Sequence, residues 1–455
     1  MKTSFVASLA LALAAAAAAP QNFSPDPEVY RAPGSISADS LRGHLSFIAA
    51  NLLEGRDTPS RGQDIATLYI AAQFRRAGLE PAGDDGYFQT AKMLRVVPVA
   101  EGFELRIRSG ARTLSVSKDQ ITVVSRQALD ISSAALYTVG DRRAVASARQ
   151  PVALLETAED DSGTLPRLID ADQEQKLSGG APRLIVRDPE AIKLMKESKT
   201  GGTAIVVSIK LPAPTATPVT VRNVAGLLRG SDSTLRGQYI LLTAHHDHLG
   251  RNDAGEVFPG ANDDGSGTVS VIEIAQALAA MPVHPKRSIV FMTFFGEEEG
   301  GLGSRYYTSH PLFTLSKTVA DLNLEQLGRT DSREGPEVSN ATLTGFRYST
   351  VPHTLQQAGA LTGVKVYDTP NGDDFFDRSD NQTFAEHGIP AHTIAVAFEF
   401  PDYHAAGDVW QKIDYTNMAK VDRMIALGLV MLADNPDPPH WNKENPKVER
   451  YLMRR

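Results

Sequence analysis

The sequence predicts an α/β protein with a mixed, mostly parallel central sheet, helices on both faces, and a β-rich inserted module. From Val221 onward, near-continuous apolar runs of strand length alternate with helical patterns, which is typical of parallel sheets covered on both sides. Between residues 96 and 220, short β-like runs are instead broken by Gly, Pro and acidic loops. A chain of 455 residues is long enough for one large domain and an insertion.

The first 19 residues, MKTSFVASLALALAAAAAA, combine one Lys, a short apolar run and a small-residue end. This pattern predicts a signal peptide over 1–19, cut a residue or two before Pro20. The run is short and Ala-rich for a membrane span, although an uncleaved anchor is the alternative. We therefore expect an exported protein, periplasmic or secreted, with no membrane span after cleavage.

Composition narrows the chemistry that the chain can use. The net charge is -8 and no basic stripe is present, so nucleic acid is not an expected partner. The sequence contains no Cys, which excludes disulfides, thiolate metal sites and a cysteine nucleophile. Any metal must be held by His, Asp and Glu.

Residues 20–95 are expected to form the N-terminal part of the catalytic domain. A Pro-rich leader precedes a pattern that becomes helical from Ser37. The segment LEGRDTPSRG is expected to be a loop before a second helix over Gln63–Ala77, which Gly78 would end. The expected apolar faces are Leu41, Leu45, Ile48 and Leu52 on the first helix, and Ile65, Leu68, Tyr69 and Ala72 on the second.

The range 96–220 is expected to be a separate β-rich insertion. Its β-like runs are FELRIRS, QITVVS, VALLET, PRLIVR and TAIVVSI, and the Pro-rich segment 211–220 would close it as a linker. It carries no catalytic cluster, so a lid or spacer is the favoured interpretation.

The range 221–455 is expected to be the main catalytic domain. The predicted strands are YILLTAH, SIVFMTFF, TVADLNLE and HTIAVAF, and the predicted helices cover about 268–280, 301–309, 351–361, 380–387 and 415–433. Ligands bind beyond the carboxyl ends of strands in such sheets, and the polar residues of this chain gather there.

One candidate site begins at the first of these strand ends. His245 and Asp247 are two residues apart and face the same side of the sheet, where a carboxylate can orient a metal-bound imidazole; His246 faces the other side. In GANDDGSG, Asp263 can bridge two cations, although a solvated turn with an N-capping Asp is the alternative.

Later strand ends supply the remaining candidates. In FFGEEEGGLGS, Glu298 can bind metal while Glu297 takes a proton from water. With Asp263 shared, one zinc would have His245 and Glu325, and the other Glu298 and His404. Each zinc then has three protein ligands and an open position, as catalytic zinc usually does.

The motifs AHHDH, PGANDDGSG, GEEEGGLGS, NLEQLG, RSDNQTFAEHGIPA and YHAAGD stand in the order found in co-catalytic zinc exopeptidases. Over about 223–433 the chain resembles this family (metallopeptidase family twenty-eight), which includes bacterial leucyl aminopeptidases and glutamate carboxypeptidases. The resemblance implies the zinc-exopeptidase, phosphorylase/hydrolase-like fold, two zinc ions per chain, and a protease-associated-like insertion over 96–220. It also implies a cis peptide between Asp263 and Asp264, and these roles: zinc ligands His245, Asp263, Glu298, Glu325 and His404, general base Glu297, and Asp247 as the residue that orients His245.

Two positions depart from the family pattern. Glu325 stands where the family usually has Asp, which keeps the oxygen donors but changes their reach. Asn381 replaces the His of an SDH motif, which leaves the substrate-side contacts open. No role is assigned to His246, His248, His387 or His392, and Phe258, Phe375, Phe376 and Tyr403 would line a side-chain pocket or pack in the core.

The expected function is hydrolysis of peptide substrates by a di-zinc exopeptidase, releasing N-terminal residues. Carboxypeptidase or dipeptidase action is an alternative on the same scaffold. Glutaminyl cyclisation with one zinc and a non-enzymatic binding role are further alternatives, against which the complete ligand set argues. The sequence leaves the preferred side chain and the oligomeric state open.

Overall fold

The computed structural model describes residues 32–97, 99, 101–124, 128–138, 152–157, 168–171, 183–252, 254–333 and 335–452. The predicted signal peptide, 1–19, lies outside these residues. Among the helices of the described ranges, none combines the length and apolarity that crossing a membrane requires.

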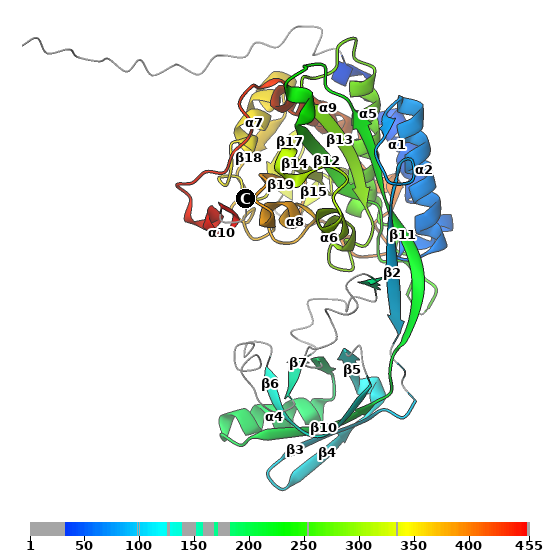
Figure 1. The fold of residues 1–455 in the computed structure, drawn as a ribbon, viewed down its shortest axis with the longest axis vertical. Helices are drawn as coiled ribbons and strands as arrows, with labels where there is room; N and C mark the ends of the chain where they lie inside the picture. The colour runs from blue at the N-terminus through cyan, green and yellow to red at the C-terminus, as the bar shows by residue number, and fades with distance from the viewer. Residues whose placement is uncertain are drawn as a thin grey trace, which may run out of the picture.

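The larger sheet of the described residues has ten strands and is mixed (Figure 1). Its order is β18 (Lys365–Tyr367), β17 (Asn340–Leu343), β19 (Ala391–Ala395), β14 (Thr318–Leu324), β12 (Tyr239–His245), β13 (Ser288–Phe294), β11 (Thr215–Leu228), β2 (Phe88–Val97) and β8 (Leu168–Asp170), with β1 (Glu80–Pro81) paired to β11. The central strands β13, β12, β14 and β19 are parallel, whereas β11, β2 and β8 pair antiparallel. The predicted α/β class with a mixed sheet is confirmed, and the parallel pairing is concentrated at the centre.

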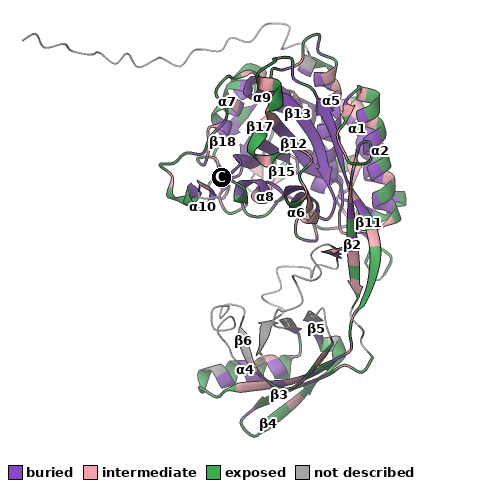
Figure 2. Cartoon of the chain, in the orientation of Figure 1, coloured by how far each residue is buried: buried purple, intermediate pink, exposed green. Residues whose placement is uncertain are grey.

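Helices cover both faces of this sheet, which explains the near-continuous apolar strands (Figure 2). Ile240 and Leu242 of β12 pack in one core with the first helix group, whereas Leu241 packs in a second core with the other group. The first group is α1 (Ala38–Ile48), α2 (Arg61–Ala77), α5 (Gly267–Ala279), α7 (Val351–Thr362) and α9 (Tyr415–Asp434); the second is α6 (Leu302–Ser309), α8 (Asn381–Glu386) and α10 (Glu449–Leu452).

The second sheet of the described residues has seven strands and lies beyond the far ends of β2 and β11 (Figure 1). Its order is β4 (Arg112–Val116), β3 (Glu104–Ser109), β10 (Ile205–Leu211), β6 (Leu129–Thr138), β7 (Val152–Thr157), β9 (Arg183–Val186) and β5 (Ile121–Val124), and α4 (Pro189–Thr200) packs on it. All these strands fall within 96–220.

The Pro-rich segment 211–220 was expected to be a linker, and this prediction is wrong. From Thr215 onward it belongs to β11, and Thr215 pairs with Val97 at the tip of β2. Thr and Val favour the extended backbone here. Pro218 is tolerated because β11 pairs with β13 only from Val224 onward, so this stretch of strand has one free edge.

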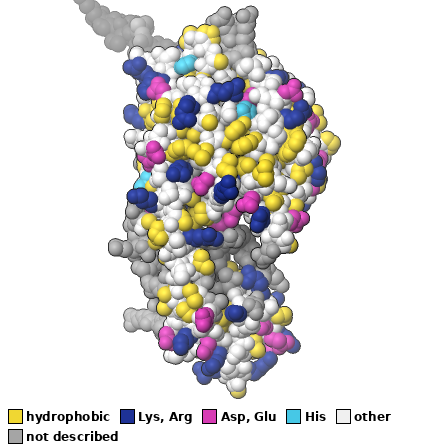
Figure 3. Space-filling view, turned by 90° about the vertical axis from the view of Figure 1, so that its right-hand side faces the viewer, with side chains coloured by type: hydrophobic (Ala, Val, Ile, Leu, Met, Phe, Trp, Pro, Cys, Tyr) yellow, Lys and Arg dark blue, Asp and Glu magenta, His cyan; other side chains and the backbone are white. Residues whose placement is uncertain are grey.

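Two predicted helix faces are wrong in part: Leu41, Leu45 and Ile48 are buried on α1 as predicted, whereas Leu52 of the first face and Leu68 of the second are exposed. α1 ends at Ile48, and Leu52 lies in the 3-10 segment η2 (Asn51–Arg56) with 88% of its surface exposed. On α2 the buried face carries Ala66, Ile70 and Phe74, while Leu68 is 60% exposed. Apolar residues run around α2 on more than one side, so periodicity alone did not identify the face that packs. On the side of the molecule seen in Figure 3, such exposed apolar side chains are interspersed with basic and acidic ones.

Candidate metal centre

The predicted site residues converge at the carboxyl ends of the central parallel strands. His245 is the last residue of β12, Glu297 and Glu298 follow β13, and Glu325 follows β14. Because these strands are parallel and adjacent, their ends deliver side chains to the same edge of the sheet. His404 reaches the same place from the loop after β19.

Asp263 lies at the middle of the cluster. Its Oδ1 is 3.3 Å from His245 Nε2, and its Oδ2 is 3.1 Å from His404 Nε2. The peptide bond between Asp263 and Asp264 is cis, in the turn that leads into α5. Burial alone would raise the pKa of Asp263, but hydrogen bonds from His245 and His404 hold it well below its usual range.

The two glutamates after β13 face different histidines. Glu297 Oε2 is 3.9 Å from His245 Nε2, and Glu298 Oε2 is 3.4 Å from His404 Nε2. Burial raises the pKa of Glu297 well above its usual range, and nearby carboxylates including Glu325 add to this while His245 opposes it. Glu297 and Glu298 thus lie on the same turn but approach different imidazoles.

Asp247 contacts both His245 and the turn after β13 that carries Glu297 and Glu298. Its Oδ1 is 3.5 Å from His245 Nδ1 and accepts a hydrogen bond from the backbone N–H of Glu297 at 3.1 Å. Its Oδ2 accepts from the backbone N–H of Glu298 at 3.4 Å. One carboxylate therefore contacts the imidazole and also fixes the turn that carries both glutamates.

Glu325 is partly buried beside the cluster, and its hydrogen bonds come from Ser379 and Asn323. Its Oε1 accepts from Ser379 Oγ and, at 3.5 Å, from Asn323 Nδ2. Burial raises the pKa of Glu325 to about 7, against an opposing effect of His245. Ser379 belongs to the SDN motif. Glu325, the first departure from the family pattern, therefore contacts the motif that contains the second departure, Asn381.

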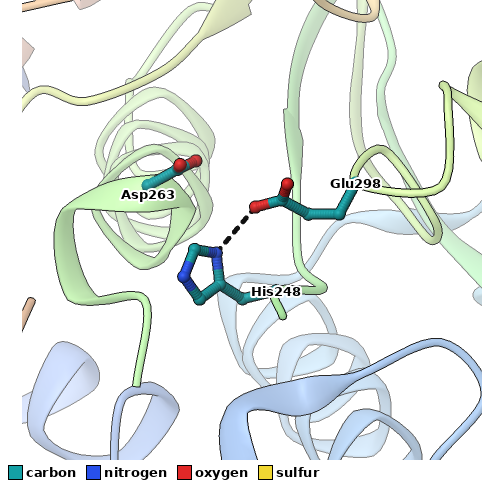
Figure 4. A group of neighbouring side chains, drawn as sticks. All are labelled: His248, Asp263 and Glu298. Carbon is teal, nitrogen blue, oxygen red and sulfur yellow. Dashed lines mark ion pairs between the residues drawn. The ribbon is translucent and has the colours of Figure 1, made fainter. Parts of the chain in front are cut away.

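Two buried residues near the cluster received no role from the sequence. His248 is fully buried, and its Nδ1 lies 2.7 Å from Glu298 Oε1 (Figure 4). The sequence offered only three histidines in four residues as a signal. By contrast, His246 bonds Thr293, and His392 bonds Ser349 and Thr344, so both have structural partners.

Arg56, the second of these residues, is fully buried at the end of η2. Its guanidinium donates to four backbone carbonyls, those of His246 (2.9 Å), Ile48 (2.8 Å), Pro259 (2.7 Å) and Gly260 (2.9 Å). Burial lowers its pKa to about 10, opposed chiefly by Asp247. The guanidinium therefore joins the end of β12 to the loop before Asp263.

A cavity of about 630 Å³ opens beside the cluster. Phe375 and Phe398 stack in its wall with ring centroids 4.6 Å apart, and the Arg378 guanidinium lies 5.0 Å from the Phe375 ring. Tyr403 also lines it, whereas Phe376 is buried in the core. The lining carboxylates are Glu297, Glu298, Glu325 and Glu399.

The donor set fits zinc. Imidazole nitrogens and carboxylate oxygens are ordinary zinc ligands, and here they come from five buried or half-buried side chains. Each oxygen of Asp263 faces a different imidazole, as expected of a carboxylate shared by two ions. His248, Asp263 and Glu298 also bring one donor atom each within 4.8 Å of one another.

This chain is similar in sequence to known metallopeptidases. Residues 223–428 match the model of Peptidase family M28. Curated relatives include a probable glutamate carboxypeptidase of Zea mays (30% identity; 42% of this chain, 26% of the relative), a probable leucine aminopeptidase of Aspergillus oryzae (29%; 35% and 36%) and aminopeptidase YwaD of Bacillus subtilis (31%; 35% and 30%). The matches thus span about a quarter to a third of the relatives' lengths.

Solved structures support the fold. An aminopeptidase from Aneurinibacillus sp. strain AM-1 aligns with a TM-score of 0.59 at 18% identity, covering 91% of this chain and all of that one. The zinc aminopeptidase BSAP of Bacillus subtilis aligns with a TM-score of 0.53 at 19% identity, covering 88% and 97%. The resemblance predicted from the sequence is confirmed: residues 223–428, which carry every predicted ligand, match peptidase family M28.

Proposed function

We propose that this protein is a di-zinc exopeptidase that releases N-terminal residues from peptides. The observation that carries the proposal is the position of Asp263 between His245 Nε2 and His404 Nε2, at 3.3 and 3.1 Å. A carboxylate shared in this way supports two ions at one site. The match to peptidase family M28 and the zinc aminopeptidase among the structural neighbours support the same metal.

The ligand assignment follows the contacts of each side chain. One zinc would be held by His245, Asp263 and Glu325, and the other by Asp263, Glu298 and His404. When bound, such a pair of ions polarises the scissile carbonyl and lowers the pKa of water. Asp247 keeps the His245 ring in the orientation that directs Nε2 at the site.

Glu297 is the proposed general base. It lines the cavity and projects from the turn that Asp247 fixes, so its carboxylate is held beside the position of the scissile bond. It would take the proton of the attacking water and later return it to the leaving amine.

The cavity favours a substrate with a free amino terminus. Of the four carboxylates that line it, Glu298 and Glu325 are assigned to the ions and Glu297 to the water, so Glu399 is the one left to pair with a cationic amine. Arg378 is the one observation that favours the second candidate, carboxypeptidase action, because a guanidinium can pair with a terminal carboxylate. The stacked rings of Phe375 and Phe398 offer an apolar surface in either case.

Replacing the general base tests the mechanism. Glu297→Gln should keep its zinc and lose at least about 100-fold in kcat, because general base catalysis contributes roughly that much or more. Metal analysis and steady-state kinetics measure the two effects, and Glu386→Gln, at an exposed position on α8, is the control. Retained turnover in Glu297→Gln would remove Glu297 from the mechanism.

A substrate panel tests the direction of attack. Amino-acid anilides with a free amine should be hydrolysed, and the same compounds with an acetylated amine should not. Hydrolysis of N-acetylated dipeptides alone would instead establish the carboxypeptidase or dipeptidase alternative.

Export is part of the proposal and rests on the sequence pattern of residues 1–19 alone. Expression with the full N-terminus should yield a shortened protein outside the cytoplasm, and its N-terminal sequence would locate the cut. An intact N-terminus on cytoplasmic protein would refute it.

A further inference from the structure

We infer that His248 is a positioning residue that holds the Glu298 carboxylate in place for its metal. The inference rests on the proposed function, because it assumes that Glu298 is a ligand. It adds a residue for which neither the sequence pattern nor the family resemblance provided a role.

The contacts divide the two oxygens of Glu298 between two histidines. His248 Nδ1 lies 2.7 Å from Oε1, and His404 Nε2 lies 3.4 Å from Oε2. Figure 4 shows the His248 ring directed at the Glu298 carboxylate, with Asp263 on the opposite side of the group. One oxygen of Glu298 is thus engaged by His248, and the other faces the side where Asp263 and His404 meet.

The distance indicates a direct contact rather than two ligands on one ion. Donor atoms bound to one tetrahedral zinc at its usual bond lengths stand about 3.4 Å apart. The 2.7 Å between His248 Nδ1 and Glu298 Oε1 is well below this, and also below the 3.1 Å between Asp263 Oδ2 and His404 Nε2, two atoms assigned to one ion; it is a distance for direct polar contact. His248 therefore acts on the metal through Glu298, much as Asp247 would act through His245.

The surroundings of His248 hold its ring in one orientation. The side chain is fully buried, and its backbone N–H donates to the Arg56 carbonyl at 3.4 Å. A Cβ on Gly260 would lie 2.4 Å from His248 Cγ, so only glycine leaves room for the ring there. The ring also meets His404 edge to face, with centroids 5.7 Å apart. A ring packed this closely can keep its Nδ1 on Glu298 without rearrangement.

Two substitutions separate positioning from other roles. Asn can place an amide N–H near the position of Nδ1 and donate to Glu298, whereas Leu fills similar space without a donor. His248→Leu should weaken the zinc site that includes Glu298 10- to 100-fold, because contacts to metal ligands have effects of about this size. His248→Asn should stay within about threefold of the wild-type affinity.

Zinc affinity is measured by competition with a chromophoric chelator, and unfolding of the metal-free proteins by urea establishes that each variant folds. His44→Leu is the control, because His44 is also buried and pairs with a glutamate, Glu273, at 2.9 Å. It should leave zinc affinity unchanged. His248→Ala replaces the Leu variant if Leu does not fold.

Each outcome decides the inference. Unchanged zinc affinity in His248→Leu would overturn it. Loss of one zinc at saturating metal in both His248→Leu and His248→Asn would also overturn it, because His248 would then be a ligand. A wild-type protein that binds no zinc would instead refute the proposed function.

Discussion

Asp263 and Asp264 are adjacent carboxylates that the structure uses in different ways. Asp263 faces His245 and His404, and these contacts keep its pKa low. Asp264 is turned to the backbone: it accepts from the N–H groups of His245 at 3.2 Å and Gly267 at 2.9 Å. Burial raises its pKa well above the usual range. The first residue is thus suited to bind cations, and the second joins the end of β12 to the start of α5.

A single buried carboxyl away from the site should govern part of the pH dependence of stability. Asp422 of α9 is fully buried, and burial raises its pKa well above the usual range despite a hydrogen bond from Ser270. Its ionised form therefore destabilises the folded state, and stability falls as the pH rises from about 4 towards the folded-state pKa. Asp422→Asn should raise the unfolding free energy at pH 8 by at least about 1 kcal/mol, since a pKa difference of one between the folded and unfolded states corresponds to about 1.4 kcal/mol.

Urea unfolding of both proteins from pH 5 to pH 8 measures this effect. The gain from Asp422→Asn should shrink as the pH falls, because the wild-type carboxyl becomes neutral. Asp437→Asn, at an exposed position, should show no such trend. A gain that grew towards acid pH would contradict the assignment.

At the level of elements, η2 braces the ends that form the site. Arg56 binds the carbonyls of His246, Pro259 and Gly260, and Thr58 Oγ1 accepts from the backbone N–H of Gly296 at 3.1 Å. These bonds hold together the end of η2, the end of β12, the loop before Asp263 and the turn after β13. The N-terminal segment around Arg56 and Thr58 is therefore bonded directly to the strand ends and loops that carry the candidate site.

Arg56→Met should lower the unfolding free energy by at least about 3 kcal/mol. The substitution leaves four buried carbonyls without their donor, and each such loss costs about 1–3 kcal/mol. Arg56→Lys should recover only a small part, because one ammonium cannot span four acceptors. Urea denaturation measures both, with exposed Arg61→Met as the control. A loss no larger than in the Arg61 variant would show that these bonds contribute little.

Sequence reasoning could find the strand ends and the side chains that they deliver, because parallel strands bring consecutive motifs to one edge. It placed α5, α6, α7, α8 and α9 to within one or two residues. It missed Arg56 because nothing in LEGR marks the arginine as buried, and it missed His248 because alternation along a strand does not extend into the loop after it. It misjudged 211–220 because a Pro-rich composition conceals strand pairing when one edge is free.

At the level of the whole molecule, β2 and β11 connect the two sheets, and this suggests how the molecule divides. Val97 and Thr215 are cross-strand partners where the second sheet begins (Figure 1). We propose that the seven-stranded sheet is a separate module and that the larger sheet with its helices carries the metal centre by itself, even without its edge strand β8, which lies within the same stretch of sequence.

Replacing residues 98–214 with a two-residue Asn-Gly turn tests this division, because such turns join antiparallel strands directly. The variant should fold and bind zinc as the wild type does. It should lose about 2 kcal/mol of unfolding free energy, since the deletion removes Leu168, which packs against Met93 and Phe295. Urea unfolding and metal analysis check both. A folded variant that no longer binds zinc would contradict the division.

The central claim is that two zinc ions share Asp263, and counting zinc per chain in wild type and Asp263→Asn tests it most directly. Asn keeps the size of the side chain but lacks the charge and the second oxygen donor. The account predicts two zinc ions per wild-type chain and at most one firmly bound in Asp263→Asn. Two zinc ions retained with unchanged affinity in the variant, or a single zinc in the wild type, would contradict it.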